Sequence, residues 1–146
     1  MGRMIAAAFG AFFVLSMVPG GVVNAGQAKP AKPALTSAQA KALKNPVAAN
    51  AASIDAGRAT YAKYCRACHG PEGKGDGPAA AAMKDVKPAN LADAKWDYGS
   101  TDGEIFNTIH SGIGPKFAMA AFQGRIPDEQ IWNLVNYTKT LSKTAK

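Results

Sequence analysis

The sequence contains few of the residues from which catalytic and metal sites are usually built, with only two cysteines and two histidines among 146 residues. Two cysteines exclude a disulfide-dense miniprotein, and they cannot by themselves complete a four-ligand zinc site. The length suits one domain of ordinary size and excludes a large multi-domain enzyme. Large apolar side chains are scarce as well, because 30 residues are alanine, which contributes little buried area.

The apolar run Met4–Val18 has 15 residues, whereas a helix that spans a bilayer needs about 20. Arg3 precedes this run and Pro19-Gly20-Gly21 ends it. The order is typical of a secretory signal peptide over residues 1–25, cleaved after Ala25 or, as second choice, after Ala28. An uncleaved membrane anchor is the alternative. Cleavage predicts an exported protein, which we expect in a bacterial periplasm.

Residues 26–53 are dominated by alanine, proline and lysine, and their only large aliphatic side chains are Leu35, Leu43 and Val47. Such a segment buries too little surface to offset the entropy that it loses on ordering. We therefore expect a flexible tether over residues 26–53, in which a short helix near 37–43 would need a partner. The folding unit is expected over residues 54–146.

Helical patterns dominate residues 54–146, and no window alternates apolar and polar residues as a half-buried strand does. Thr101-Asp102-Gly103-Glu104 is a capping box that predicts a helix start, and Gly112 predicts the end of that helix. Residues 128–143 carry apolar side chains at helical spacing, with acidic residues in the first turn. Helices are also expected over 54–69 and, shorter, over 78–84. The predicted fold class is all-α, with long loops.

Both cysteines and one histidine fall within Cys65-Arg66-Ala67-Cys68-His69, the attachment signature of c-type haem. Two thiols about one helical turn apart can add to the two vinyl groups of the porphyrin, and the adjacent histidine can bind the iron. A thioredoxin-like redox pair would need a preceding strand, a zinc site would need two more ligands, and a disulfide would close a very small loop. Export favours haem, because c-type haem is attached outside the cytoplasm. We therefore predict one haem c, attached through Cys65 and Cys68.

Covalent haem also accounts for the small core of the folding unit. Residues 54–146 contain only 22 large apolar side chains, which is few for a domain of this size. The macrocycle is itself a large apolar group that these side chains can surround.

His69 is the expected proximal ligand of the iron, and the second axial ligand is chosen from Met119, Met83 and His110, with an open site as a further alternative. Met119 is favoured because it lies 50 residues after His69 in a loop between two helices, which can fold back over the distal face. Met83 falls in the short expected helix, where methionine is typical core filler. His110 is near a helix end, where a surface or haem-edge position is the plainer interpretation.

With these motifs, residues 54–141 resemble a class I cytochrome c, above all the bacterial periplasmic monohaem type. The matching pieces run the length of the unit: Asp55-Ala56-Gly57 with Tyr61, Cys-x-x-Cys-His-Gly at 65–70, Gly73-Lys74-Gly75-Asp76-Gly77-Pro78, Lys87-Pro88-Ala89-Asn90-Leu91, the Met119 loop and residues 128–141. The resemblance implies a cytochrome c fold of three to five helices wrapped around one haem. It also implies that the first helix crosses the last, with Gly57 and Tyr61 against Leu134 and Tyr137.

Two further features concern the haem ligands. The resemblance implies that the carbonyl of Pro88 accepts the ring N–H of His69 and so fixes its orientation. The family commonly has Met-Pro-x-Phe at the distal ligand, whereas this chain has Met119-Ala120-Ala121-Phe122. The missing proline frees the backbone after the ligand.

His/Met ligation is typical of electron transfer, because a soft thioether stabilises reduced iron and a filled sixth site excludes small ligands. We therefore expect an electron-transfer protein and not an enzyme: a monomer that carries single electrons between periplasmic or membrane-bound partners such as a quinol-oxidising complex, a dehydrogenase, or a terminal oxidase or reductase. Peripheral association with a membrane is compatible with this expectation. One alternative is a cytochrome subunit of a larger respiratory or dehydrogenase complex, docked by residues 26–53. Another is a haem enzyme or gas sensor with an open sixth site.

The formal net charge of +7 does not indicate a broadly basic surface. Of the 17 lysines and arginines, only 12 lie in residues 54–146, where they face 10 acidic residues. Two ionised haem propionates would bring this part of the chain close to neutral. Nucleic acid is therefore not expected as a partner.

Overall fold

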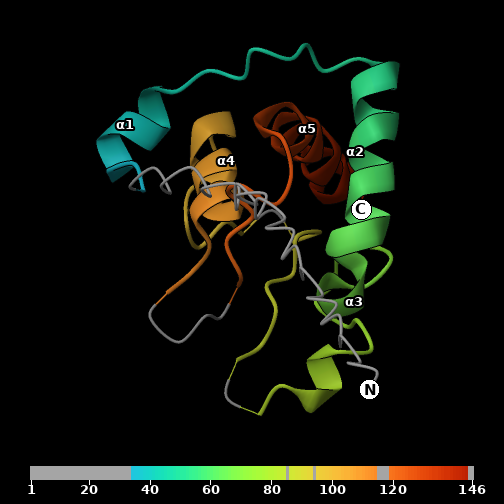
Figure 1. Cartoon of the computed structure of the whole chain (residues 1–146). Helices are drawn as coiled ribbons and strands as arrows, with labels where there is room; N and C mark the ends of the chain where they lie inside the picture. Colours follow the sequence, from blue (N-terminus) through green and yellow to red (C-terminus); the bar gives the residue numbers. More distant parts are fainter. Residues whose placement is uncertain (1–33, 85, 94, 115–118, 145–146) are drawn as a thin grey trace, which may run out of the picture.

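The computed structural model describes residues 34–84, 86–93, 95–114 and 119–144. The expected signal peptide over residues 1–25 and the first part of the expected tether lie outside the described residues. The elements are α1 (Ser37–Ala42), α2 (Ala51–Tyr64), α3 (Arg66–His69), the 3-10 turn η1 (Ala80–Ala82), α4 (Asp102–Ser111) and α5 (Asp128–Thr144) (Figure 1). Within these ranges no strand occurs beyond one isolated bridge between Ile113 and Met119, and the predicted all-α fold is confirmed. Among the described helices, none is long and apolar enough to cross a membrane.

The crossing of α2 and α5 forms the centre of the fold (Figure 1). Gly57 is buried there, and a Cβ at this position would lie 2.7 Å from the carbonyl carbon of Asn133 and 2.8 Å from Cβ of Tyr137. The ring of Tyr61 packs against that of Tyr137 with 5.2 Å between centroids. Leu134 is fully buried in the same core. Gly57 thus permits the close approach of the two helices, as predicted.

The first long helix begins three residues earlier than expected. Asn50 caps α2, since its side chain accepts the N–H of Ser53 at 3.0 Å and its own N–H reaches the Ser53 hydroxyl at 3.2 Å. The reciprocal pair satisfies two backbone groups that a helix start leaves free. The Asn-x-x-Ser pattern that carries this start lies inside the segment expected to be a tether.

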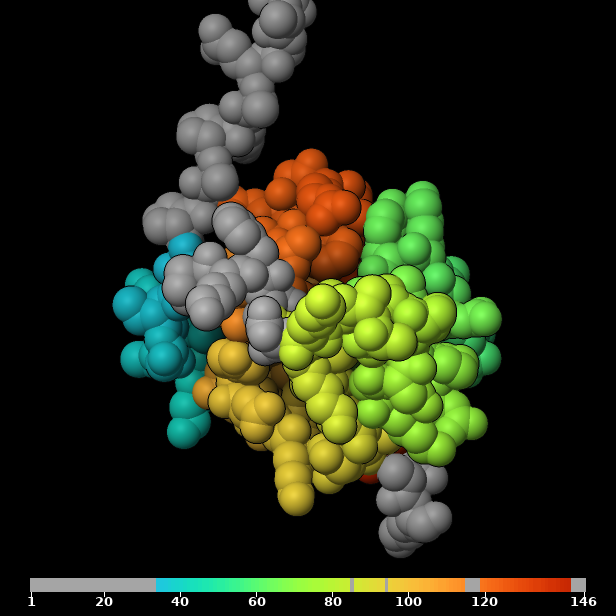
Figure 2. All heavy atoms as spheres, turned by 90° about the horizontal axis from the view of Figure 1, so that it is seen from below, coloured from blue at the N-terminus to red at the C-terminus, as the bar shows by residue number. Residues whose placement is uncertain are grey.

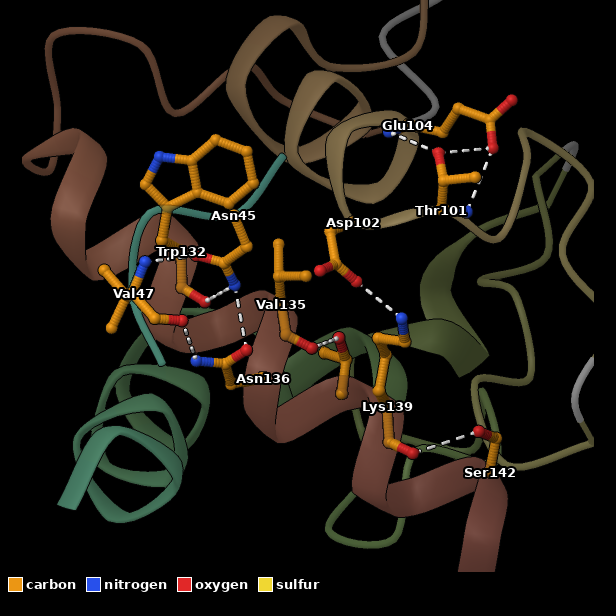
Figure 3. Close-up of polar contacts among 11 residues, drawn as sticks. Asn45, Val47, Thr101, Asp102, Glu104, Trp132, Val135, Asn136, Lys139 and Ser142 are labelled. Atoms are coloured by element: carbon orange, nitrogen blue, oxygen red, sulfur yellow. Dashed lines mark hydrogen bonds and ion pairs between the residues drawn. The ribbon is translucent and has the colours of Figure 1, made fainter. Parts of the chain in front are cut away.

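The helix α4 closes the core against α5 and confirms the prediction over residues 101–111. The Thr101 hydroxyl accepts the N–H of Glu104 at 3.4 Å, and the Glu104 carboxylate accepts the N–H of Thr101 at 3.0 Å (Figure 3). Phe106 stacks on Trp132 of α5 with 4.0 Å between ring centroids. This aromatic contact ties the two helices that flank the Met119 segment.

Residues 34–50, which we call the N-terminal strap, differ from the flexible tether that composition predicted. The helix α1 lies beside α4, and Ala40 is buried with only 2% of its surface exposed (Figure 1). Gly103 permits the contact, because a Cβ there would lie 2.6 Å from the Leu43 carbonyl oxygen. The Asn107 side chain pairs with both backbone groups of Leu35, at 3.1 and 3.4 Å.

The rest of the strap is held by α5. The side chain of Asn45 donates to that of Asn136 at 2.8 Å, and Asn136 in turn donates to the carbonyl of Val47 at 3.2 Å (Figure 3). Composition alone predicts a flexible segment here because it reflects only the apolar area that the segment can bury. Hydrogen bonds from asparagines far along the chain, with the close approach at Gly103, supply the partner that the expected short helix required.

Candidate functional site

Cys65 forms the joint between α2 and α3, where the expected helix over residues 54–69 is broken. Its φ of −114° and ψ of −37° depart from the helix, although its N–H still donates to the Tyr61 carbonyl at 2.9 Å. The Cys65 carbonyl accepts the N–H groups of Cys68 at 3.1 Å and His69 at 2.9 Å. One helical turn therefore separates the two cysteines, and His69 follows directly. Both thiols are free and partly exposed.

The segment after His69 folds back along α3 and occupies its free carbonyl groups. The N–H of Gly75 donates to the His69 carbonyl at 2.9 Å, and that of Gly77 donates to the Cys68 carbonyl at 3.1 Å. A Cβ on Gly77 would lie 2.6 Å from the carbonyl carbon of Ala67, and Gly75 has a φ of +75° that favours glycine. The alternating glycines therefore let this loop lie against the end of the Cys-x-x-Cys-His segment.

The ring of His69 is oriented by Ala89 and not by Pro88, which corrects the assignment made from the resemblance. His69 Nδ1 lies 3.0 Å from the Ala89 carbonyl oxygen. The Pro88 carbonyl oxygen instead contacts the site where a Gly75 Cβ would be, and so faces the glycine loop. Because a carbonyl only accepts, the Ala89 contact places the proton on Nδ1 and leaves the Nε2 lone pair available to a metal.

Burial sets the protonation of this site. It raises the pKa of the Cys65 thiol to about 12, and the neighbouring Cys68 adds to the rise. Burial lowers the pKa of His69, an effect that the hydrogen bond to Ala89 opposes. The site therefore presents a neutral Cys65 thiol and a neutral imidazole at pH 7. A thioredoxin-like pair would need a cysteine of lowered pKa, so the burial of Cys65 argues against that alternative.

The three residues proposed as distal ligands lie in different environments. Met119 is partly buried and packs against the core cluster, as Cys65 does. Met83 has 37% of its surface exposed, so it does not serve as core filler. His110 is buried rather than at the surface, with its ring stacked on Phe106 and Nε2 3.8 Å from a carboxylate oxygen of Asp128. The His110 side chain therefore packs between the end of α4 and the start of α5.

An aromatic contact that the sequence did not reveal links the two halves of the site. Tyr64, which precedes Cys65, meets the ring of Phe122, three residues after Met119, edge to face with 5.9 Å between centroids. Aromatic residues beside the two motifs were the only signal that could have indicated this contact.

On the face seen in Figure 2, the yellow-green segment near residues 70–92 and the gold segment near 95–105 lie side by side around a small hollow.

The residues fit a covalently bound haem better than the other sites considered. Two free thiols lie one turn apart, a neutral imidazole keeps Nε2 available, and glycines without side chains line the loop beside them. No group of three or more histidine, cysteine or acidic side chains suited to a metal ion occurs in the part of the chain described, which gives a zinc site no support.

Comparison with known proteins agrees with a site for covalently bound haem. The family described as "Cytochrome C oxidase, cbb3-type, subunit III" matches residues 52–137. Subunit CcoP of the cbb3-type cytochrome c oxidase of Rubrivivax gelatinosus is 35% identical over 96 residues, which are 66% of this chain and 28% of that protein. Subunit FixP of the corresponding oxidase of Bradyrhizobium sp. (strain ORS 278) is 33% identical over 86 residues, 59% of this chain and 27% of that protein. The chain thus spans little more than a quarter of the length of these relatives.

Among solved structures, a chain of the reducing HAO-like protein complex of Kuenenia stuttgartiensis has a similar fold. The TM-score is 0.63 at 27% sequence identity, and the alignment covers 75% of this chain and 50% of that chain. This structural alignment covers more of the chain than the sequence alignments with the two oxidase subunits, which cover 66% and 59% of it.

Proposed function

This chain belongs to the c-type cytochrome family described as cbb3-type cytochrome c oxidase subunit III, which binds covalently attached haem c, and on that premise we propose that it carries single electrons between redox proteins of the bacterial periplasm. When bound, the haem supplies a one-electron Fe³⁺/Fe²⁺ couple. In this proposal the chain holds one haem, through thioethers to Cys65 and Cys68. His69 and Met119 would be the two protein ligands of the iron.

The contact between His69 and Ala89 is the observation that carries the proposal. The carbonyl accepts the proton of Nδ1 at 3.0 Å and so fixes both the tautomer and the orientation of the ring. Burial keeps the imidazole neutral by lowering its pKa, as metal ligation requires. His69 follows directly on a Cys65–Cys68 turn whose carbonyls are held by the glycine loop, so the proposed ligand sits on a rigid support.

Met119 would give the site its electron-transfer character. A soft thioether favours reduced iron, and a sulfur in the sixth position excludes small ligands. The partly buried Met119, packed against the core, meets this need better than the exposed Met83 or the engaged His110.

The substitution Met119→Ala tests this assignment. We expect the oxidised wild-type protein to show the weak red-edge absorption band of a Met–iron bond, and we expect Met119→Ala to lose it. Met83→Ala is the matched control and should retain the band, because Met83 directly follows η1 and 37% of its surface is exposed. A band that survives in Met119→Ala would refute the ligand assignment. Rapid binding of carbon monoxide by the reduced wild-type protein would favour an enzyme or sensor with an open site.

A second candidate function is that of a subunit within a larger redox complex. The relatives from Rubrivivax and Bradyrhizobium are named as oxidase subunits, and the similar structure from Kuenenia comes from a protein complex. Size-exclusion chromatography of native extract, followed by haem absorbance, separates the two. A freely diffusing carrier elutes as a small monomer, whereas a subunit elutes with its complex.

Export to the periplasm is part of the proposal and has its own test. The N-terminal sequence of the haem-loaded protein should begin at Gly26 or, for the second cleavage site, at residue 29. A protein that begins at Met1 and fractionates with membranes would support an uncleaved anchor.

A further inference from the structure

The backbone around Met119 is bonded to the end of α4. The N–H of Ile113 donates to the Met119 carbonyl at 2.9 Å, and the N–H of Phe122 donates to the Ile109 carbonyl at 3.1 Å. The N–H of Gln123 donates to the His110 carbonyl at 2.9 Å. Residues 119–123 therefore run back along the last turn of α4 and the residues after it.

Gly112 lies at the centre of this arrangement. Its N–H donates to the Thr108 carbonyl at 3.0 Å and ends α4, and its φ is +71°. A Cβ on Gly112 would lie 2.6 Å from the Met119 carbonyl oxygen and 2.7 Å from the Ala121 nitrogen. Real Cβ contacts are essentially never this short, and both atoms belong to the backbone, so no side-chain rotation can relieve the overlap.

Met119 is followed by Ala120, which leaves the φ angle after the proposed ligand free to vary. Proline would limit the backbone after the ligand by fixing its φ angle. Here, the contact with Gly112 and the bond from Ile113 both act on the Met119 carbonyl. We infer that Gly112 is a positioning residue for Met119, because its lack of a side chain lets the end of α4 hold the backbone that carries the ligand.

This inference rests on the proposed function, in which Met119 binds the iron. A side chain at Gly112 would push the Met119–Ala121 backbone away from α4 and displace the sulfur. The contact, and not the positive φ alone, is what the inference requires. Gly124 separates these two effects, because its φ is +72° and a Cβ there would meet nothing within 4 Å.

The experiment compares Gly112→Ala with Gly124→Ala in the haem-loaded protein. We expect Gly112→Ala to lose the red-edge Met–iron band, to bind carbon monoxide faster when reduced, and to show a lower reduction potential. Gly124→Ala should retain all three properties of the wild-type protein, although Gly124 also has a positive φ, of +72°. Far-UV circular dichroism should give equal helix content for both variants.

A second variant tests the same role by rescue. Met119 lies in a β-bridge, and an extended residue is what a following proline requires. Because a proline would also restrict the backbone after Met119, the double variant Gly112→Ala/Ala120→Pro should recover part of the lost band. Recovery supports the inference even where Gly112→Ala alone is poorly folded. Failure of the double variant to fold or to recover any band counts against it.

The remaining outcomes overturn the inference in distinguishable ways. Retention of the band and the potential in Gly112→Ala would show that Gly112 does not position the ligand. Loss of the band in Gly124→Ala as well would assign the effect to backbone strain. If Met119→Ala leaves the wild-type band unchanged, the ligand assignment itself is wrong.

Discussion

At the scale of single residues, the Cys-x-x-Cys-His segment depends on a hydroxyl from the preceding helix. The Tyr61 side chain is buried and its hydroxyl donates to the carbonyl of Gly70 at 2.8 Å. Gly70 directly follows His69 and ends α3. The hydroxyl thus fixes the residue where the chain turns from the histidine into the glycine loop, while the Tyr61 ring packs on α5.

We predict that Tyr61→Phe destabilises the protein by about 1–2 kcal/mol, because a buried carbonyl is left without its donor while the ring packing is kept. Urea unfolding of the haem-loaded protein measures the change. Tyr98→Phe is the control, since Tyr98 is 57% exposed, and it should change stability by less than about 0.5 kcal/mol. Equal effects of the two substitutions would show that the Gly70 contact contributes nothing.

The residue that orients His69 illustrates what sequence reasoning can reach at this scale. The resemblance implied that the Pro88 carbonyl accepts the ring N–H of His69, whereas the structure places the Ala89 carbonyl oxygen 3.0 Å from Nδ1. Adjacent carbonyls in a non-helical segment point in different directions. Which of them faces a ring depends on the packing of Gly75 against Pro88, and no local pattern in the sequence encodes that contact.

At the scale of elements, α4 depends on the reciprocal cap between Thr101 and Glu104 (Figure 3). The hydrogen bond from the Thr101 N–H is the largest cause of a lowered pKa at Glu104, and the bond from the Thr101 hydroxyl adds to it. Because the folded pKa lies below the usual value of 4.5, the ionised carboxylate stabilises the folded state. This contribution is complete above the unfolded pKa and is lost as the pH falls through the folded pKa.

We therefore predict that Glu104→Gln reduces the acid sensitivity of the protein. The amide can still accept the Thr101 N–H, but it has no charge to lose below pH 4.5. Urea unfolding at neutral pH and at about pH 3 should show a smaller fall in stability for Glu104→Gln than for the wild-type protein. Glu129→Gln, an exposed acid in the first turn of α5, should keep the steeper wild-type fall. Identical pH profiles for wild type and Glu104→Gln would contradict this role.

The elements that sequence analysis found are those whose signals are local. The helix over residues 101–111 has its cap and its terminating glycine within the segment, and α5 has a long apolar repeat with acids in its first turn. The start of α2 was missed although its Asn50-x-x-Ser53 cap is local, because that cap lies in a segment of tether-like composition. A short helix near 37–43 was expected only if it had a partner, and the residues that hold α1 lie elsewhere in the chain. The strap is held by Gly103, Asn107 and Asn136, which no short window around residues 34–50 contains.

Asn136 is the residue of α5 on which the second half of the strap depends. Its side chain accepts from Asn45 and donates to the Val47 carbonyl and to the Ser53 hydroxyl, and only 6% of its surface is exposed. We predict that Asn136→Ala lowers the free energy of unfolding by about 2–4 kcal/mol, because several buried partners lose their hydrogen bonds. Trypsin should then cleave faster after Lys41 and Lys44, which are exposed on the strap.

Asn133→Ala is a matched control for Asn136→Ala, because Asn133 is a buried asparagine on the same helix. Its side-chain oxygen finds no hydrogen-bond partner among the described residues, so its removal should cost less. Tryptic cleavage at Lys41 and Lys44 should remain at the wild-type rate in this variant. Faster cleavage in Asn133→Ala than in Asn136→Ala would refute the contribution of the asparagine network.

At the scale of the whole molecule, the strap extends the folded body beyond residues 52–137, where the family matches. Its helix α1 covers α4, and its second half lies along α5, so it joins the two helices that flank the Met119 segment (Figure 1). The strap therefore acts on the stability of the frame around the proposed site, while the proposed haem ligands all lie outside it. Stability and haem ligation should then respond differently to its loss.

We predict this difference for a variant in which residues 34–50 are replaced by a glycine-serine linker of equal length. Stability in urea should fall by about 2–4 kcal/mol, because the variant loses the burial of Ala40, Leu43 and Val47 and the bonds to Asn107 and Asn136. The red-edge Met–iron band should remain at neutral pH, because Gly112 and Ile113 hold Met119 independently of the strap. An unchanged stability would mean that the strap contributes nothing to the fold, as expected of the flexible tether that composition alone predicts. Loss of the band without unfolding would instead mean that the position of α4, and through it the ligand, depends on the strap.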